Sequence, residues 1–350
     1  MGGVTGGAFG NILEASGLPA EVELAREAIQ NSCDASAGQR PVLVRFKILH
    51  LTGDEKLRFM EVLQLLDGLG SRARELSLPE PNCLENGSER LQLTFIEDFE
   101  TVGLSGDPHS PDSHFFRLLL ELGDPAKTAD VGTGGSYGFG KSALSLPSRL
   151  RTIVAYTLFN DAERGAVHRL MGCGYFRPHR HAGSHYTGRA WFAVPCNHDG
   201  ENGYHPVEGI EAQQLARSLG FVERTSAGTS ILVVDSQVDP DLLIEGIEDW
   251  WWPRLLDAKL QVEVEVDGAS RHPRLRSNPR LAPFIQCYEL AIGKSGPVGT
   301  HQKCAELNRL AGQDLGRCAF MYLEAHEEQR LAPSWADSRS ASVALIREPR

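Results

Sequence analysis

Hydrophobic residues recur every three or four positions near the beginning of the chain. This spacing predicts an amphipathic helix over about residues 19–35. Its apolar positions are Leu24, Ala25, Ala28, Ile29 and Cys33. Glu27, Asn31 and Asp34 are spaced by four and then three positions, so they share one stripe of the same helix. Taken alone, such a polar stripe is more typical of a solvated helix face.

Strand patterns follow at several places along the chain. Residues 91–98 predict a strand that ends at Asp98, and a flexible loop containing Gly103 and Gly106 follows it. Further strands are predicted over residues 151–159, 188–194 and 230–234, the last entered through Thr229. The segment of about residues 172–207 is rich in histidine and glycine, which is typical of an insertion between core strands.

A glycine-rich segment precedes a predicted helix start at residues 143–146. Its glycines include Gly134, Gly135, Gly138 and Gly140, and Lys141 and Ser142 follow directly. Glycines let backbone amides approach phosphate oxygens, and a helix N-terminus adds a favourable dipole. The segment therefore predicts phosphate binding, with Lys141 as an additional point charge.

The pattern changes after Asp235. A helix of about a dozen residues is predicted from Asp239 to a stop at Pro253, followed by an alternating strand over residues 260–266 and an Asp267-Gly268 turn. Three consecutive tryptophans, residues 250–252, cannot all face one way on a helix, so we expect them to fill a core or a seam between domains. A last strand is predicted over residues 342–346, so close to the end that we expect the chain to be a fragment of a longer protein.

Length and composition indicate two modest domains. The 350 residues are 41% hydrophobic, which can fill one large core and a second unit. We expect a flexible N-terminal segment at residues 1–18, a first domain at 19–235 and a smaller αβ domain at 236–350. Seven cysteines without a Cys-x-x-Cys pair argue against zinc fingers and a disulfide framework, and favour the cytoplasm. The sequence contains no long apolar run and no signal-peptide pattern, so we expect no membrane association.

The net charge of −11 argues against a chain that is basic as a whole. Two loops do concentrate positive residues, one around residues 177–181 and one around residues 271–280. Such runs are more typical of solvated loops than of nucleic-acid interfaces. Direct DNA contact therefore stays an open question in the sequence. The irregular spacing of the histidines between residues 179 and 205 does not favour a zinc site.

The helix, the strand ending at Asp98, the glycine-rich segment and the Thr229 strand start resemble, in this order, the GHKL superfamily. This ATP-binding fold is shared by DNA gyrase, the large heat-shock chaperones, histidine kinases, MutL and MORC proteins, and the resemblance covers about residues 20–235. It implies that Glu27 activates the attacking water, Asn31 binds Mg²⁺ and Asp98 binds the adenine amino group. Thr229 would support the adenine contact through a water, and Asp34 would be mainly structural.

The resemblance also implies an α+β fold, with helices over a mixed β-sheet and a transducer-like αβ domain after it. Gly103 and the glycines from Gly134 to Gly140 would line the phosphates as part of a mobile lid, near Lys141 and Ser142. Lys294 stands where a second domain would supply a lysine, although no motif surrounds it. The family's Asp-x-Gly-x-Gly pattern is one residue longer here, and Glu100 stands in place of the first glycine.

Two alternatives stay open. Gly135-x-x-x-x-Gly140-Lys141-Ser142 also satisfies the P-loop pattern, and residues 230–235 imitate a strand that ends in a magnesium-binding aspartate. The polar residues 123–134 do not fit the buried strand that precedes a P-loop. The second alternative is a scaffold module that binds ATP without hydrolysis, because Glu100 and the longer loop have altered the site.

The sequence thus predicts a magnesium-dependent ATPase of GHKL type with slow turnover, which ATP switches towards a homodimer. A role in DNA repair, chromosome handling or phage defence, with further protein partners or domains, is an expectation from fold analogy alone.

Overall fold

The computed structural model describes the chain in several stretches. These are residues 17–65, 75–76, 78, 89–120, 143–198, 201–294, 301–308, 314–323, 331 and 333–334. The expected N-terminal segment is described only from residue 17, and the expected strand at 342–346 lies outside the described residues.

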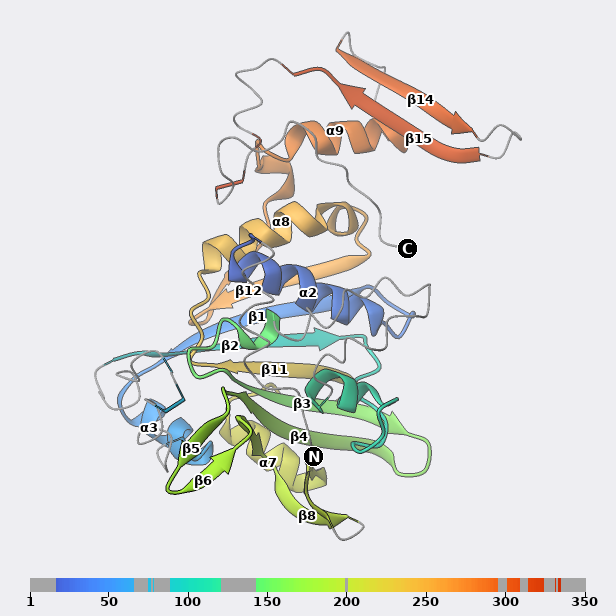
Figure 1. The fold of residues 1–350 in the computed structure, drawn as a ribbon. Helices are drawn as coiled ribbons and strands as arrows, with labels where there is room; N and C mark the ends of the chain where they lie inside the picture. The colour runs from blue at the N-terminus through green and yellow to red at the C-terminus, as the bar shows by residue number, and fades with distance from the viewer. Residues whose placement is uncertain are drawn as a thin grey trace.

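A nine-stranded mixed sheet forms the centre of the described structure (Figure 1). The strand order is β10-β4-β3-β11-β2-β1-β12-β13, and β7 pairs with β4 beside this path. The strands are β1 (Val42–Leu51), β2 (Leu91–Phe99), β3 (Thr152–Asp161), β4 (Gly165–Tyr175), β7 (Arg189–Phe192), β10 (Val207–Glu208), β11 (Gly228–Val234), β12 (Leu260–Val266) and β13 (Ala269–Arg271). Within the described strands of this sheet, β1 and β12 run parallel and the other pairs are antiparallel. The predicted mixed sheet is therefore confirmed.

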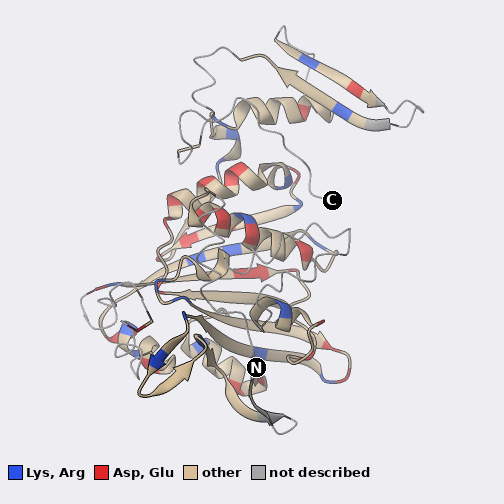
Figure 2. Ribbon diagram, in the orientation of Figure 1, with Lys and Arg blue, Asp and Glu red and all other residues tan. Residues whose placement is uncertain are grey.

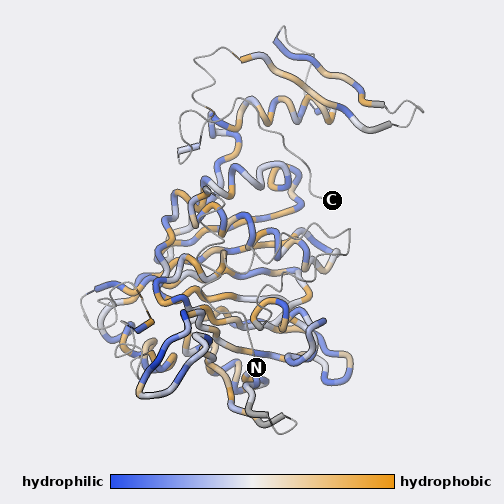
Figure 3. Tube along the Cα trace, viewed as in Figure 1, coloured by the Kyte–Doolittle hydropathy of each residue, from blue (hydrophilic) through white to orange (hydrophobic). Residues whose placement is uncertain are grey.

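Helices cover both faces of this sheet. On one face α2 (Ala20–Asp34) and α8 (Pro240–Leu256) share a hydrophobic core with the strands, and α2 matches the predicted helix closely. On the other face α3 (Gly53–Val62) and α7 (Gly209–Ser218) pack over a second core. Alternation along β11 supplies both cores, because Ile231 faces the first and Leu232 the second. Figure 3 shows hydrophobic residues along the central strands, and a hydrophilic hairpin of β5 (His179–His181) and β6 (Ser184–Tyr186) outside them.

The sheet extends beyond the domain boundary expected at residue 235. Strand β12 pairs with β1 in register from Val42 and Leu260 onwards, and α8 packs on α2. A separate small unit follows, and it forms the upper end of the view in Figure 1. Its elements are η3 (Leu275–Ser277), α9 (Ala282–Ala291), β14 (Gln302–Asn308) and β15 (Asp314–Met321). The first body therefore includes at least residues 240–271 of the segment expected to form the second domain.

Two of the three consecutive tryptophans fill cores, and the expectation that all three do so is wrong for Trp250. Trp251 lies in the α2–α8 core, whereas Trp252 packs with Leu281 and Ile285 in a third cluster. Trp250 is 46% exposed. The predicted helix stop at Pro253 is wrong, because α8 continues through it to Leu256. Proline lacks a backbone N–H, and burial of the neighbouring tryptophan rings offsets the lost hydrogen bond.

The expected insertion consists mainly of hairpins. One pairs β5 with β6, and another pairs β8 (Val194–His198) with β9 (Glu201–His205). A short π-helix, η1 (Phe116–Leu120), lies in the segment that follows β2. In the part of the chain that the structure describes, no helix is both long and apolar enough to span a membrane.

Candidate functional site

Asp98 lies at the carboxyl end of β2, where β2 pairs with the start of β11. Its Oδ1 accepts a hydrogen bond from the backbone N–H of Thr229 at 2.7 Å and one from Oγ1 of Thr101 at 2.5 Å. Ile96 and Ile231 both face the α2 core, so the alternation of each strand turns Asp98 and Thr229 towards that same face. Two predicted site residues from distant segments are thus in direct contact.

A threonine on the neighbouring strand completes the arrangement. Oγ1 of Thr157, on β3, donates to the carbonyl of Gly228 at 2.9 Å and accepts from the N–H of Leu104 at 2.9 Å. It lies 3.5 Å from Oγ1 of Thr229. Thr157 therefore connects β3, β11 and the loop after β2.

Gly103 brings this loop close to β3. It has a φ of +72°, and a Cβ there would lie 2.4 Å from the carbonyl oxygen of Leu158. No side chain fits at that separation, so the close approach of loop and strand requires glycine.

The environment of Asp98 opposes its ionisation in part. Burial raises the pKa of its carboxyl above the ordinary value, while the Arg224 guanidinium and the hydrogen bonds from Thr101 and Thr229 act in the opposite direction. Among the described residues, none donates a hydrogen bond to Oδ2 of Asp98. This oxygen can therefore accept a hydrogen bond from a bound molecule.

The predicted polar stripe of α2 is present, but its members differ in surroundings. Glu27 is 8% exposed, accepts a hydrogen bond from Nε of Arg26 at 2.9 Å, and forms an ion pair with Nη2 of Arg26 at 2.8 Å. Asn31 and Asp34 are exposed, and Asp34 accepts from the Gln30 amide at 3.2 Å. The carboxylate predicted to be catalytic is thus held by the arginine that precedes it.

Backbone hydrogen bonds join the carboxyl end of α2 to the loop that follows Asp98. The N–H of Ala37 donates to the carbonyl of Glu100 at 2.9 Å, and the N–H of Val102 donates to the carbonyl of Ala35 at 2.9 Å. Glu100 has a φ of +62°, in the left-handed region that favours glycine. This conformation fits the glycine that the family pattern expects at this position.

Six predicted phosphate-binding residues lie outside the described residues. They are Gly134, Gly135, Gly138, Gly140, Lys141 and Ser142. The described residues on either side, Leu119 and Leu144, both pack in the core that contains Ala28 and Ile29 of α2. Both flanks of the glycine-rich segment are therefore on the α2 face of the sheet.

Two cavities formed by described residues are lined by neither Glu27 nor Asp98. One of about 60 Å³ lies against α7, where Tyr156 and Arg224 contribute to its wall. The other, of about 550 Å³, is bounded by α8 and the arginines between residues 271 and 280. The convergence of Glu27 and Asp98 on one bound nucleotide stays a prediction.

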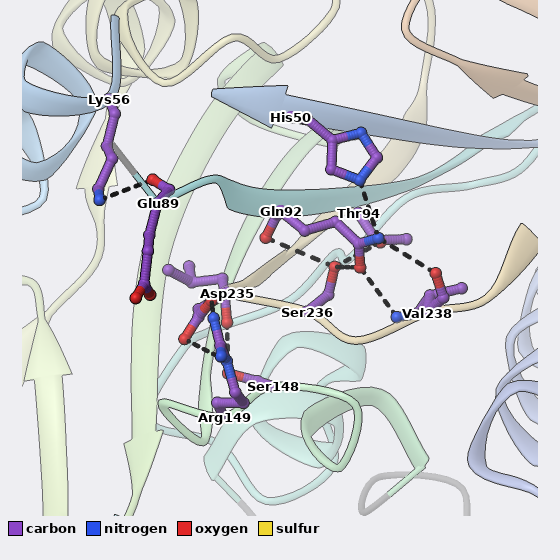
Figure 4. Close-up of polar contacts among 11 residues, drawn as sticks. His50, Lys56, Glu89, Gln92, Thr94, Ser148, Arg149, Asp235, Ser236 and Val238 are labelled. Atoms are coloured by element: carbon purple, nitrogen blue, oxygen red, sulfur yellow. Dashed lines mark hydrogen bonds and ion pairs between the residues drawn. The ribbon is translucent and has the colours of Figure 1, made fainter. Parts of the chain in front are cut away.

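The opposite end of β11 does not resemble a P-loop site. Strand β11 is antiparallel to both neighbours, whereas a P-loop protein uses parallel strands. Asp235 is 1% exposed and accepts from Nη2 and Nε of Arg149 at 2.7 and 3.0 Å (Figure 4). Beside it, Oε1 of Gln92 accepts a hydrogen bond from the Ser236 hydroxyl at 2.8 Å. The polar side chains at this end of the sheet therefore contact one another. A carboxylate so engaged is not free to bind magnesium.

Most of the arginines in the basic cluster at residues 271–280 are paired with acids. Arg271 pairs with Asp241 at 2.7 Å, and Arg280 pairs with both Glu245 and Asp249 at 3.0 Å. Figure 2 shows that acidic residues predominate on α2 and α8. Lys294, considered as a second-domain lysine, pairs with Asp257 at 3.5 Å. Among the described residues, no group of three His, Cys, Asp or Glu side chains is arranged to hold a metal ion.

Comparison with known proteins gives a distant structural likeness. No protein-family model matches the chain, and no curated protein matches it. The ATPase region of Saccharomyces cerevisiae topoisomerase II bound to ICRF-187 (dexrazoxane) aligns with 81% of this chain at 9% identity and a TM-score of 0.34. A second structure of that region aligns with 81% at 10% identity and a TM-score of 0.33. The chain spans 57% of the length of each of those chains. The likeness is to the ATPase region of a topoisomerase, and it is too distant to assign a function.

Proposed function

We propose that this protein binds ATP at the end of β2, with Asp98 as the acceptor for the adenine amino group. The contact between Asp98 and Thr229 carries the proposal, because it fixes a partly buried carboxylate whose second oxygen is bound by no described residue. An acceptor at this position binds an exocyclic amine and repels a carbonyl oxygen. Thr157 on β3 and Gly103 in the loop after β2 hold that loop close to β3 beside Asp98.

The polar stripe of α2 supplies the groups for hydrolysis. Glu27 would act as the general base towards water, and the exposed amide of Asn31 is a hard oxygen donor that suits Mg²⁺. Among the described residues, none donates to or accepts from the Asn31 amide, so it fits a role as a single ligand beside phosphate oxygens and water. The ion would neutralise phosphate charge. The predicted phosphate contacts from Gly134 to Ser142 rest on the sequence.

A specific observation favours a second candidate, a module that binds ATP without hydrolysis. Arg26 donates a hydrogen bond to Glu27 through Nε, forms an ion pair with it through Nη2 at 2.8 Å, and lies over the Trp250 ring at 5.2 Å. The Oε1 atom of Glu27 is engaged by this guanidinium and is not available to accept a proton from water. Nucleotide binding and turnover therefore need separate measurements.

Two substitutions separate these candidates and test the proposal. ATP affinity and turnover are measured for the parent chain, Glu27→Ala and Asp98→Asn. We expect Glu27→Ala to bind ATP as the parent does and to lose turnover, and Asp98→Asn to lose binding because its amide nitrogen is a donor. Parent binding without turnover selects the second candidate. If Asp98→Asn binds ATP as tightly as the parent, the adenine site is not at Asp98.

The wider biological role rests on the sequence resemblance. In this proposal ATP favours a homodimer in the cytoplasm, and the resulting switch serves DNA-directed work such as repair, chromosome handling or phage defence. Sedimentation with and without ATP tests the switch, since a nucleotide-driven dimer shifts the mass of the sedimenting species. Equal sedimentation in both states would remove the dimer from the proposal.

A further inference from the structure

Arg224 approaches Asp98 from behind the proposed adenine site. The arginine follows α7, is 4% exposed and directs its guanidinium at the junction of β2 and β11. Its Nη1 and Nη2 donate to the main-chain carbonyl of Asp98 at 2.9 and 3.0 Å. Nη2 also donates to the carbonyl of Thr229. One side chain therefore holds the backbones of both residues that form the site.

A serine and an aromatic ring fix the guanidinium in place. Oγ of Ser230 accepts from Nε and Nη2 of Arg224 at 3.1 and 2.9 Å. The guanidinium carbon lies 5.2 Å from the centre of the Phe99 ring. A charged group held by several hydrogen bonds and a ring face keeps a single orientation.

Gly228 leaves the space that Arg224 occupies. A Cβ at this position would lie 2.2 Å from Nη1 of Arg224 and 2.6 Å from the carbonyl oxygen of Asp98. The glycine therefore admits the guanidinium to the backbone of the site. Gly228 leaves space for the guanidinium of Arg224, Ser230 accepts hydrogen bonds from it, and the guanidinium in turn binds the carbonyl of Asp98.

The charge of Arg224 also acts on the Asp98 carboxyl group. Among the described residues, Arg224 is the charged side chain whose field lowers the pKa of Asp98, against the opposing effect of burial. Burial lowers the pKa of the Arg224 guanidinium, as does the charge of Arg45 on β1, whereas Asp98, Glu97 and Tyr156 act in the opposite direction. An ionised Asp98 accepts from the amine of adenine, whereas a protonated Asp98 can donate to the carbonyl of guanine.

We propose that Arg224 is a positioning residue that sets the preference of this site for adenine over guanine nucleotides. It acts through Asp98, whose backbone it orients and whose carboxylate form it favours. The inference rests on the proposed ATP site and adds to it a residue on the far side of the sheet. Loss of Arg224 lowers ATP affinity and narrows the ratio of ATP to GTP affinity.

The test measures the affinities of the β,γ-imido analogues of ATP and GTP by calorimetry. We expect Arg224→Gln to lose about tenfold in affinity for the ATP analogue and to retain its affinity for the GTP analogue, as expected for loss of one charged hydrogen-bond group. Arg224→Lys keeps the charge and should recover part of the preference. The matched control is Arg45→Gln, because Arg45 also lies over Phe99 and pairs with Glu97 at 2.6 Å without contacting Asp98.

A structural role alone gives a different result. If Arg224→Gln lowers the unfolding temperature but leaves the ATP-to-GTP ratio unchanged, the inference is overturned and the ATP site stands. If the parent binds neither analogue, the proposed function and the inference fail together. Should Arg224→Gln not fold, Ser230→Ala removes an acceptor of the guanidinium and should narrow the ratio about threefold. An unchanged ratio in a folded Ser230→Ala protein, with Arg224→Lys also unchanged, overturns the inference.

Discussion

Oδ1 of Asp98 and the backbone N–H of Thr229 are 2.7 Å apart, although 131 positions separate these residues in the chain. The contact exists because β11 inserts between β2 and β3 and is antiparallel to both. It places a carboxylate, three threonine hydroxyl groups and a glycine turn at one end of the sheet, on the face covered by α2.

Asp98→Asn should change the pH dependence of stability. Burial raises the pKa of Asp98 in the folded protein, so the folded state binds more protons than the unfolded state between the two pKa values. The parent therefore gains stability as the pH falls through the folded pKa towards the unfolded value of about 3.8, and loses this contribution as the pH rises. The variant lacks this titration. At pH 7 the unfolding free energy of Asp98→Asn should be equal to or higher than that of the parent. The difference should become smaller, or turn in favour of the parent, towards pH 4.

Urea unfolding from pH 4 to pH 8 measures the difference in unfolding free energy. The control is Asp112→Asn, because the Asp112 side chain is 95% exposed and pairs weakly with Arg117 at 3.6 Å. Its difference from the parent should be flat with pH. If the difference in unfolding free energy between Asp98→Asn and the parent were also independent of pH, burial of the Asp98 carboxyl would not raise its pKa as described.

Gly103→Ala should destabilise the protein more than another glycine substitution with a similar backbone. Gly103 and Gly38 have φ values of +72° and +76°, but a Cβ meets the Leu158 carbonyl in the first case and nothing within 4 Å in the second. The left-handed backbone costs each alanine about 1–2 kcal/mol. The clash should add about 2 kcal/mol at residue 103 alone. Equal losses in urea unfolding would mean that the loop does not approach β3 as described.

The local features of the fold could be predicted from the sequence. A 3.6-residue repeat suffices for α2, and the alternation and turn residues suffice for the strand before Asp98 and for the β12–β13 hairpin. The extent of α8 could not be predicted, because Pro253 signals a stop while the packing of Trp251 and Trp252 depends on distant residues. The extension of the sheet beyond residue 235 could not be predicted for the same reason, since the parallel pairing of β12 with β1 joins residues 260 and 42.

The candidate site likewise combines residues that local sequence predicts with residues that it does not. Asp98 and Thr229 were predicted from motifs, whereas Thr157 and Arg224 were missed. Only strand register and loop placement bring Thr157 and Arg224 next to Asp98 and Thr229. A threonine within a buried strand and an arginine after a helix carry no local signal. The stripe of α2 was predicted, but the engagement of Glu27 by Arg26 depends on side-chain rotamers that spacing does not determine.

Glu100→Gly should stabilise the protein slightly. The left-handed backbone costs the glutamate about 1–2 kcal/mol, and glycine removes that strain while losing part of the gain to the unfolded chain. The Glu100–Arg40 pair, at 3.6 Å and well exposed, contributes little. We expect a gain of about 0.5 kcal/mol in urea unfolding. Ala258→Gly, at a φ of 54°, is the control and should give a similar gain. A loss of stability with Glu100→Gly would point to a side-chain contact of Glu100 that outweighs the strain.

Arg26→Gln should raise the turnover of ATP without changing its affinity. The guanidinium of Arg26 donates to Glu27, pairs with Glu23 at 3.4 Å and is stacked on Trp250, so it is held against the proposed base. Removing it leaves Glu27 free to accept a proton from water, and kcat should rise about threefold to tenfold, within the range of a single general base.

Trp250→Ala loosens the same arginine from the other side and should act in the same direction but more weakly. Glu23→Gln is the opposing control, because it leaves Glu27 as the remaining carboxylate partner of Arg26 among the described pairs and should lower kcat. If kcat instead falls in Arg26→Gln with KM unchanged, the arginine orients the base and does not restrain it. If the parent shows no turnover and Arg26→Gln gains it, the protein is an ATP-binding module whose hydrolysis this pairing suppresses.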